Sequence, residues 1–386
     1  MILRKIIVAT LVAVFVAANV CAAATKSAAR KELPLTATAA ILVEASTGRS
    51  VYEKNADERR YPASMTKMMT AILALENARL GENVAISPNA AATEDSELDL
   101  TTEEMLTVEE LVTGMMLISD NGAAVAIAEH IKGSVPQFAA LMNEKAKEIG
   151  CTNTHFTNAN GLPNENHYST ARDMAKIAAY GLKNETFAHI VRTEKATIRY
   201  VLPKDKFTVV ENTNDLLQDF DGAIGIKTGW TQAAGGCLAA AAKRNGVTLI
   251  AVIMGATDVD TRFEDARTLL DYGFQNVKMH KGISAARTKT GIWLKDGTEY
   301  KVSAGPVADL DYPLINGETA DKYSFRYDIP RFLTAPVKKG DTVGKLFLQY
   351  DGETVGTVDV ALRETIPQGF SFASFFFVGL LSLIMG

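Results

Sequence analysis

Ser64 and Lys67 are the first residues in this sequence whose types and spacing could do chemistry. They open an apolar segment that predicts a helix from Ser64 to about Leu80, and residues three apart in a helix share one face. The Lys67 amine would therefore lie beside the Ser64 hydroxyl, which is a weak nucleophile unless a base adjoins it. A lysine acts as that base only when burial or a second positive charge lowers its pKa. The apolar helix would supply the burial, and Lys227 could supply the charge.

Two further short motifs follow along the chain, Ser119-Asp120-Asn121 and Lys227-Thr228-Gly229. The first lies in a predicted connection between two helices, a suitable place for side chains that point into a cleft. From there Ser119 could relay a proton, and Asn121 could hold a substrate amide or orient Lys67.

The third motif is predicted to end a strand just before Gly229. An extended peptide could pair with that strand, and a glycine there leaves room for close approach. The N-terminus of the helix at Ser64 would supply one backbone N–H to a developing negative charge, and the Trp230 N–H would be the second oxyanion donor.

Each motif is weak evidence by itself, because a Ser-x-x-Lys pattern is expected about once by chance in a chain of this length. A surface serine or lysine is the ordinary interpretation of any one of them. All three occur in order, each in its required local context, and together they form the signature of penicillin-binding proteins and class A β-lactamases.

The elements that must position these motifs are predicted from apolar periodicity and capping signals. A hairpin is expected at 39–53, followed by a block of helices and then by strands that end in one more helix. The predicted helices are 64–80, 107–117, 121–132, 136–150, one starting at 170, and 262–272. The predicted strands of the second half are 197–202, 207–210, 224–228, 236–243 and 247–254. This order favours an α+β fold with an antiparallel sheet and a helical block. The resemblance of the three motifs to that signature implies that the fold is of the β-lactamase/transpeptidase type.

The pattern changes at about Asn276, beyond which short alternating segments are separated by the turn signals Asp296-Gly297 and Asp351-Gly352. We therefore predict a catalytic domain over 25–275, beginning with an unstructured lead-in, and a small all-β domain over 276–365.

Both ends of the chain are predicted to be targeting segments. Residues 1–24 have a short basic start, an apolar run and small residues for cleavage, which is typical of a secretory signal peptide; an uncleaved membrane anchor is the alternative. Residues 366–386 are predicted to anchor the chain, since no charge occurs from Gly369 to Gly386 and phenylalanines are crowded there; a buried terminal helix is the alternative. Eighteen helical residues would reach roughly 27 Å, just short of a bilayer core.

Composition narrows the function classes. The formal net charge of −5 disfavours nucleic acid as a partner, because phosphate binding usually needs a basic face. No spacing typical of zinc ligands occurs, so no metal and no cofactor are predicted. Cys151 and Cys237 could pair in an exported chain or remain small buried residues, and the sequence does not decide between these.

The chain resembles the low-molecular-mass penicillin-binding proteins of the D-alanyl-D-alanine carboxypeptidase type, peptidase family S11. The resemblance spans about 30–386 and is carried by the segments 61–70, 153–156, 160–162, 168–175 and 225–229. It implies a transpeptidase-like catalytic domain, a β-rich second domain, a C-terminal membrane anchor and a location on the outer face of the bacterial cytoplasmic membrane. Its implied partners are peptidoglycan stem peptides as substrates and β-lactam antibiotics as covalent inhibitors.

The resemblance also implies residue roles. Ser64 would attack the carbonyl between two terminal D-alanines, Lys67 would take its proton, and Ser119 would pass a proton to the leaving D-alanine. Asn121 would contact the substrate, while Lys227 and Thr228 would bind its terminal carboxylate. Arg262 matches an arginine that assists this recognition; a surface helix residue is the less favoured alternative. Trp230 stands where some relatives carry histidine.

Two alternative functions are also compatible with part of the sequence. A β-lactamase begins with the same acyl-enzyme, but class A enzymes use a glutamate-bearing loop after the Ser-Asp-Asn motif, and no convincing Glu-x-x-x-Asn occurs there. A membrane-held scaffold whose β domain does the work is the rival outside catalysis, and the intact trio of motifs disfavours it.

Overall fold

The computed structural model describes residues 32–370 and 372. The predicted signal peptide at 1–24 lies outside the described residues, as does most of the predicted anchor. No helix among the residues that the structure does describe is long and apolar enough to cross a membrane. Both segments therefore stay predictions.

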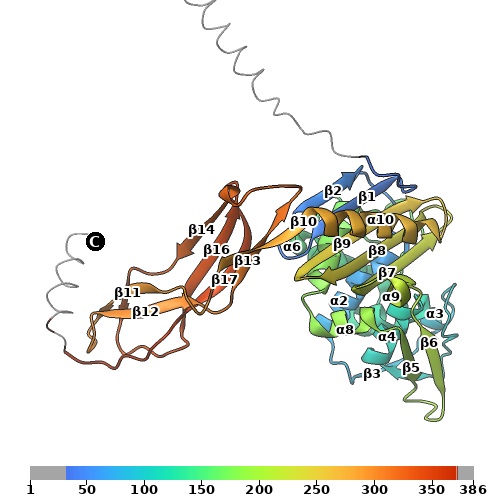
Figure 1. The fold of residues 1–386 in the computed structure, drawn as a ribbon. Helices are drawn as coiled ribbons and strands as arrows, with labels where there is room; N and C mark the ends of the chain where they lie inside the picture. The colour runs from blue at the N-terminus through green and yellow to red at the C-terminus, as the bar shows by residue number, and fades with distance from the viewer. Residues whose placement is uncertain (1–31, 371, 373–386) are drawn as a thin grey trace, which may run out of the picture. The chain divides into compact units, whose positions relative to one another are not determined.

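A five-stranded antiparallel sheet forms the centre of the N-terminal part, in the order β2-β1-β9-β8-β7 (Figure 1). The strands are β1 (Ala39–Glu44), β2 (Ser50–Lys54), β7 (Ala223–Thr231), β8 (Gly235–Arg244) and β9 (Val247–Ala256). Strands from the two ends of this segment thus pair at its centre, β1 against β9. The strand that carries Lys227-Thr228-Gly229, β7, is an edge strand, so one of its sides has no partner strand within the described chain.

Both faces of this sheet are covered, which explains its nearly continuous apolar strands. Alternate residues of a strand point to opposite faces. Ile41 and Val43 belong to the core shared with the helical block, whereas Leu42 lies against Gly273 of α10 (Thr261–Asn276). One face therefore packs on α10 and the other on the helical block, beside which Ser64 and Ser119 lie.

The helical block follows the capping signals of the sequence closely. Its longer helices are α2 (Lys67–Asn77), α4 (Val108–Leu117), α5 (Asn121–Lys132), α6 (Val135–Ile149), α7 (Ala171–Gly181) and α8 (Glu185–Arg192). The side chains of Thr107 and Thr170 cap α4 and α7 as predicted, and Gly133 and Gly150 end α5 and α6 in the left-handed conformation. The remaining helices, α3 (Pro88–Ala91) and α9 (Leu216–Asp219), are single turns.

The helix predicted over 64–80 was wrong at both ends. The chain forms a 3₁₀ turn at Ala63–Thr66 before α2, and α2 ends at Asn77 rather than near Gly81. The early end has a tertiary cause, because the Leu80 and Glu82 carbonyls accept backbone bonds from the start of α4. The chain then enters β3 (Asn83–Ala85), which pairs with β4 (Met105–Thr107).

Other elements differ in detail from the sequence predictions. The strand predicted at 197–202 is β5 (Lys195–Arg199), paired with β6 (Phe207–Glu211), and α8 was not predicted at all. Cys151 and Cys237, whose pairing the sequence left open, are both buried free thiols.

The C-terminal part is built of strands, as predicted, with a single 3₁₀ turn at Ala320–Lys322 among its described residues. Its strands are β10 (Val277–Ile283), β11 (Thr290–Lys295), β12 (Lys301–Pro306), β13 (Leu310–Ile315), β14 (Tyr323–Asp328), β15 (Phe332–Thr334), β16 (Thr342–Tyr350) and β17 (Glu353–Leu362). Six form one sheet, β14-β16-β17-β12-β11-β15, while β10 pairs with β13. The predicted turn residues Asp296 and Asp351 both have positive φ.

Candidate active site

Lys67 and Ser64 lie side by side at the start of α2. Lys67 Nζ is 2.8 Å from Ser64 Oγ, 2.6 Å from Asn121 Oδ1 and 2.8 Å from the Asn160 carbonyl oxygen. A neutral amine has two N–H donors and one lone pair. It can therefore donate to Asn121 and Asn160 and accept the proton of the Ser64 hydroxyl, which is the arrangement a general base needs.

Burial prepares Lys67 for this role. The side chain is inaccessible to solvent, and burial lowers its pKa to about 7, against the opposing charges of Asp120 and Asp95. The second positive charge that the sequence suggested, Lys227, is present, but burial rather than this charge lowers the pKa of Lys67. Burial, followed by the charges of Lys67 and Arg262, holds the pKa of Lys227 well below its ordinary value of 10.5.

Two glycines, Gly161 and Gly229, bring other backbone segments close to the 3₁₀ turn that contains Ser64. A Cβ added to Gly161 would lie 2.0 Å from the Ala63 carbonyl oxygen, and one added to Gly229 would lie 3.1 Å from the Ser64 nitrogen. Ala63 itself has a φ of +48°, a strained conformation that non-glycine residues adopt mainly where the surroundings impose it. Segments about 100 and 165 residues away in the sequence therefore hold Ser64 in place.

A buried histidine, His167, also contacts the turn that contains Ser64. His167 Nε2 lies 2.8 Å from Thr66 Oγ1, and His167 Nδ1 accepts the Thr157 N–H at 3.1 Å. Burial lowers the pKa of His167 to about 4, so the ring is neutral and its Nε2–H donates to Thr66. We assign His167 a positioning role, since its contacts are with Thr66 and Thr157.

The Ser-Asp-Asn motif lies between α4 and α5, as predicted. Ser119 has a φ of +66° and lines the same pocket as Ser64, while Asn121 begins α5 and meets Lys67. Asp120 between them is buried. Its carboxylate accepts the Ala123 and Leu98 N–H groups, both at 2.7 Å, which fixes the start of α5.

Two buried basic side chains at the other side of the site, Lys227 and Arg262, each have a nitrogen that lacks a hydrogen-bond partner in the part of the chain that the structure describes. Neither Lys227 Nζ nor Arg262 Nε has a hydrogen-bond partner among the described residues. Arg262 Nη1 does donate to the Gly229 carbonyl oxygen, at 2.9 Å. Burying an unsatisfied charged group is costly, so such groups call for a partner of opposite charge, such as a ligand carboxylate. Thr228 lies beside them and is held by Thr213, with 2.6 Å between the two hydroxyl oxygens.

A pocket of about 370 Å³ brings the predicted site residues together. Its lining contains Ser64, Ser119, Asn121, Thr228, Gly229, Trp230 and Arg262. Lys67 and Lys227 are outside this lining but belong to the same cluster, Lys67 through its contact with Ser64 and Lys227 through its place before Thr228 on β7. Trp230 is 53% exposed, as a residue at the rim would be.

The sequence missed several residues that complete the site. Asn160 contributes its backbone carbonyl oxygen, and Gly161 contributes the room left by its missing side chain. Neither contribution comes from a reactive side chain that a sequence motif would reveal. Both residues lie in the segment 160–162, which contributes to the family resemblance, but neither had a predicted role. Thr213 belongs to no recognisable motif. Asp120 belongs to the Ser-Asp-Asn motif, in which only Ser119 and Asn121 had predicted roles.

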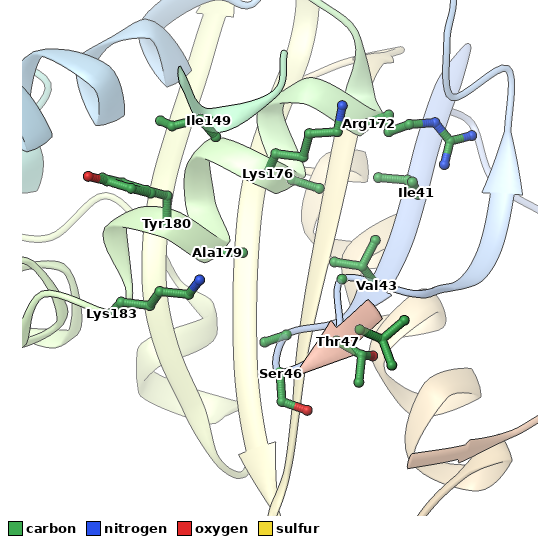
Figure 2. Close-up of a pocket in the computed structure, with 14 residues that line it drawn as sticks. Ile41, Val43, Ser46, Thr47, Ile149, Arg172, Lys176, Ala179, Tyr180 and Lys183 are labelled. Carbon is green, nitrogen blue, oxygen red and sulfur yellow. The ribbon is translucent and has the colours of Figure 1, made fainter. Parts of the chain in front are cut away.

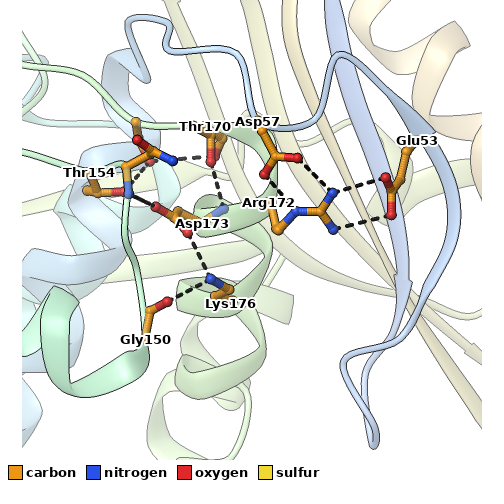
Figure 3. Close-up of polar contacts among 10 residues, drawn as sticks. Glu53, Asp57, Gly150, Thr154, Thr170, Arg172, Asp173 and Lys176 are labelled. Atoms are coloured by element: carbon orange, nitrogen blue, oxygen red, sulfur yellow. Dashed lines mark hydrogen bonds and ion pairs between the residues drawn. The ribbon is translucent and has the colours of Figure 1, made fainter. Parts of the chain in front are cut away.

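Other residues of the segment 153–175 hold the fold together around Asp173 (Figure 3). Asp173 accepts hydrogen bonds from the Asn153 backbone at 2.8 Å and from Thr154 Oγ1 at 2.9 Å, and Lys176 pairs with it at 3.0 Å. The Thr170 side chain accepts the Asp173 N–H. These contacts tie the start of α7 to the segment that leads towards Asn160, so they position the site from a distance.

A second pocket is lined by β1 and α7, with Arg172, Lys176 and Lys183 among its residues (Figure 2). Arg172 is already paired with Glu53 and Asp57 (Figure 3), and this pairing raises the pKa of Arg172. The lining residues include no serine or cysteine beside a base of the Lys67 kind. Of these two pockets, the one lined by Ser64 has a serine hydroxyl beside a buried lysine.

Comparison with known proteins decides the family. Residues 24–258 match the family described as D-alanyl-D-alanine carboxypeptidase. The chain belongs to this family. Residues 274–368 match the C-terminal domain of penicillin-binding protein 5, which accounts for the all-β part.

Relatives of the D-alanyl-D-alanine carboxypeptidase family cover most of the chain. DacF of Bacillus subtilis is 33% identical over 342 residues, which are 87% of each protein, and DacC of Escherichia coli is 32% identical over 349 residues, 85% of this chain and 84% of DacC. Both are named D-alanyl-D-alanine carboxypeptidases.

Solved structures of the family are similar to this one. Penicillin-binding protein 5 of Haemophilus influenzae has a TM-score of 0.66 at 30% identity, covering 88% of this chain and 99% of that one. The Streptomyces K15 DD-transpeptidase has a TM-score of 0.61 at 34% identity, covering 64% of this chain and 99% of its own.

Proposed function

We propose that the protein is a serine-type D-Ala-D-Ala carboxypeptidase, which removes the terminal D-alanine from peptidoglycan stem peptides through an acyl-enzyme on Ser64. The observation that carries this proposal is the pair of buried, incompletely hydrogen-bonded cations, Lys227 and Arg262, in the cluster that contains Ser64. A free C-terminal carboxylate supplies the missing negative charge. A peptide bound by that carboxylate presents its last peptide bond to the nucleophile.

The reaction uses two proton transfers. Ser64 Oγ attacks the carbonyl carbon of the penultimate residue while its proton passes to Lys67 Nζ. Backbone N–H groups at the start of the Ser64 helix and at Trp230 stabilise the oxyanion. The C–N bond then breaks as the proton held by Lys67 passes through the Ser119 hydroxyl to the leaving D-alanine amine, and water later hydrolyses the ester.

β-Lactams follow the same first step. The lactam carbonyl acylates Ser64, and the leaving nitrogen stays attached to the adduct. It therefore cannot diffuse out of the pocket, and a long-lived covalent complex is the consequence.

We further propose that the protein is exported by residues 1–24 and held at the outer face of the bacterial cytoplasmic membrane by residues 366–386. The basic–apolar–small pattern of the first segment and the uncharged, phenylalanine-rich second one support this location. The catalytic and all-β domains would occupy 25–275 and 276–365.

We expect the purified protein to release free D-alanine from a peptide ending in D-Ala-D-Ala. The matched peptide whose terminal carboxylate is amidated should be cleaved about 10²-fold more slowly, because hydrogen bonds to charged groups contribute about 1.5–3 kcal/mol. Quantifying free D-alanine from both peptides checks this. No release from the free acid would refute the proposed function, and equal rates for the two peptides would refute the role given to Lys227 and Arg262.

A further inference from the structure

The outer face of the six-stranded sheet carries a row of aromatic and basic side chains. In the register of this sheet, Trp293 on β11 pairs with Lys301 on β12 and with Phe332 on β15. The β11 neighbours of Trp293, Ile292 and Leu294, are buried in the core of the sheet. Alternate strand residues point to opposite faces, so Trp293, Lys301 and Phe332 share the face that is turned away from this core.

Cations surround the aromatic rings of this row. Lys301 Nζ lies 4.1 Å from the centre of the Trp293 ring, and Lys295 Nζ lies 5.2 Å from that of Phe332. Exposed Arg331 precedes Phe332, and exposed Tyr300 stands 6.1 Å from Trp293 between ring centres. We call Trp293, Lys295, Tyr300, Lys301, Arg331 and Phe332 the aromatic–basic face.

The charge of this face is mainly positive. Lys295, Lys301 and Arg331 form no ion pair with other described residues. The nearby acidic residues are Asp296 and Glu299, both exposed in the turn that joins β11 to β12, and exposed Glu364, whose carboxylate accepts the Ser303 N–H at 2.7 Å. The three cations are therefore available to an outside anion.

The chain leaves the domain beside this face. Gln368 forms a β-bridge with Gly297, and the Gly369 N–H donates to the Asp296 carbonyl oxygen at 3.0 Å. Trp293 is only four residues from Gly297, about 13 Å along a strand. The sequence then continues without a charged residue from 369 to 386, beginning with Phe370 and Phe372, which are 79% and 70% exposed. The uncharged segment thus starts beside the turn that joins β11 (Figure 1) to β12.

We propose that the aromatic–basic face binds the headgroup region of an anionic lipid bilayer. Tryptophan and tyrosine favour the boundary between water and hydrocarbon, and lysine and arginine are drawn to anionic headgroups. The adjoining uncharged segment identifies the occupant, because it would bring this face to a membrane. The strength of interfacial binding grows with buried apolar area and with attraction to anionic lipids, so a basic face beside an apolar segment would strengthen attachment. This inference rests on the membrane attachment in the proposed function and is independent of the proposed reaction.

The chain has only two tryptophans, Trp230 and Trp293, which makes a direct test possible. In the full-length variant W230F, Trp293 is the sole tryptophan. Mixed with phosphatidylglycerol vesicles that carry brominated acyl chains, its fluorescence should shift to the blue and be quenched. The matched variant W293F leaves only Trp230, whose fluorescence should not be quenched.

Charge substitutions complete the test. Full-length K295Q/K301Q/R331Q should bind phosphatidylglycerol vesicles about 10²-fold more weakly, since each cation near an anionic surface adds roughly a factor of five. Its binding to phosphatidylcholine vesicles should not change. The control K322Q/R326Q/K345Q removes the same charge from β14, β16 and the turn before β14, at the other edge of the sheet, and should bind normally.

Three results would overturn the proposal. The first is a vesicle-bound W230F protein whose Trp293 is not quenched, and the second is equal weakening in both triple variants. The third is loss of binding to isolated peptidoglycan rather than to vesicles in K295Q/K301Q/R331Q, which would assign the face to a glycan. D-Alanine release from a soluble peptide, measured on the same samples, reports separately on the proposed reaction.

Discussion

The variant Lys67→Met should acylate Ser64 with penicillin about 10³-fold more slowly than the unaltered protein. Methionine fills a similar volume in the buried site but cannot accept the Ser64 proton from 2.8 Å, and a general base contributes roughly 10²–10⁴ in rate. Stopped-flow or quenched-flow measurement of the acylation rate tests this. Lys183→Met is the matched control, because Lys183 is exposed and lies outside the site.

The pH dependence of the same rate provides a second readout. Only the neutral amine can take the proton, and the pKa of Lys67 lies at about 7. The neutral fraction grows as the pH rises through that value, so acylation should increase from pH 5 to pH 8 with a midpoint near 7. A Lys67→Met variant that acylates within a few-fold of normal, or a midpoint near the ordinary lysine value of 10.5, would show that Lys67 is not the base.

The variant Gly161→Ala should lose at least about 10²-fold in acylation rate. Its new Cβ would lie 2.0 Å from the Ala63 carbonyl oxygen and 3.0 Å from the Ser64 nitrogen, so the nucleophile turn must move. A displacement of about 1 Å at a reacting group can cost this much, because the attack geometry is lost. The acylation rate and the melting temperature should be measured together.

The control variant Gly150→Ala separates the effect of the Gly161–Ala63 contact on the acylation rate from the effect of backbone strain. Gly150 has a φ of +87°, close to the +94° of Gly161, but a Cβ there meets nothing within 4 Å. The left-handed conformation should cost each variant on the order of 1–3 kcal/mol of stability, and Gly161→Ala should lose more because its Cβ also overlaps Ala63. Only Gly161→Ala should lose the additional rate. Similar acylation rates for the two variants would mean that the contact with Ala63 does not position Ser64.

Local signals explain which elements could be predicted from the sequence. The caps at Thr107 and Thr170 and the left-handed glycines at 133 and 150 lie where short-range rules place them, because a cap needs only residues within one turn. The three motifs were likewise recognisable because each keeps its chemistry within three or four residues.

Long-range contacts explain what could not be predicted. The end of α2 at Asn77 depends on backbone bonds to α4, and the turn at Ser64 depends on Gly161 and Gly229. Such contacts join backbone atoms far apart in the sequence and leave no periodic pattern. The lowered pKa values of Lys67 and Lys227 also required the structure, because burial of these two side chains cannot be read from their motifs.

The central claim is that Ser64 is the nucleophile, and locating the penicillin adduct tests it most directly. The protein should be treated with benzylpenicillin, digested and analysed by mass spectrometry. We predict one adduct with the mass of intact penicillin on the peptide that contains Ser64, and none in the variant Ser64→Ala. An adduct on another residue such as Ser119, or an equal adduct in Ser64→Ala, would contradict the account.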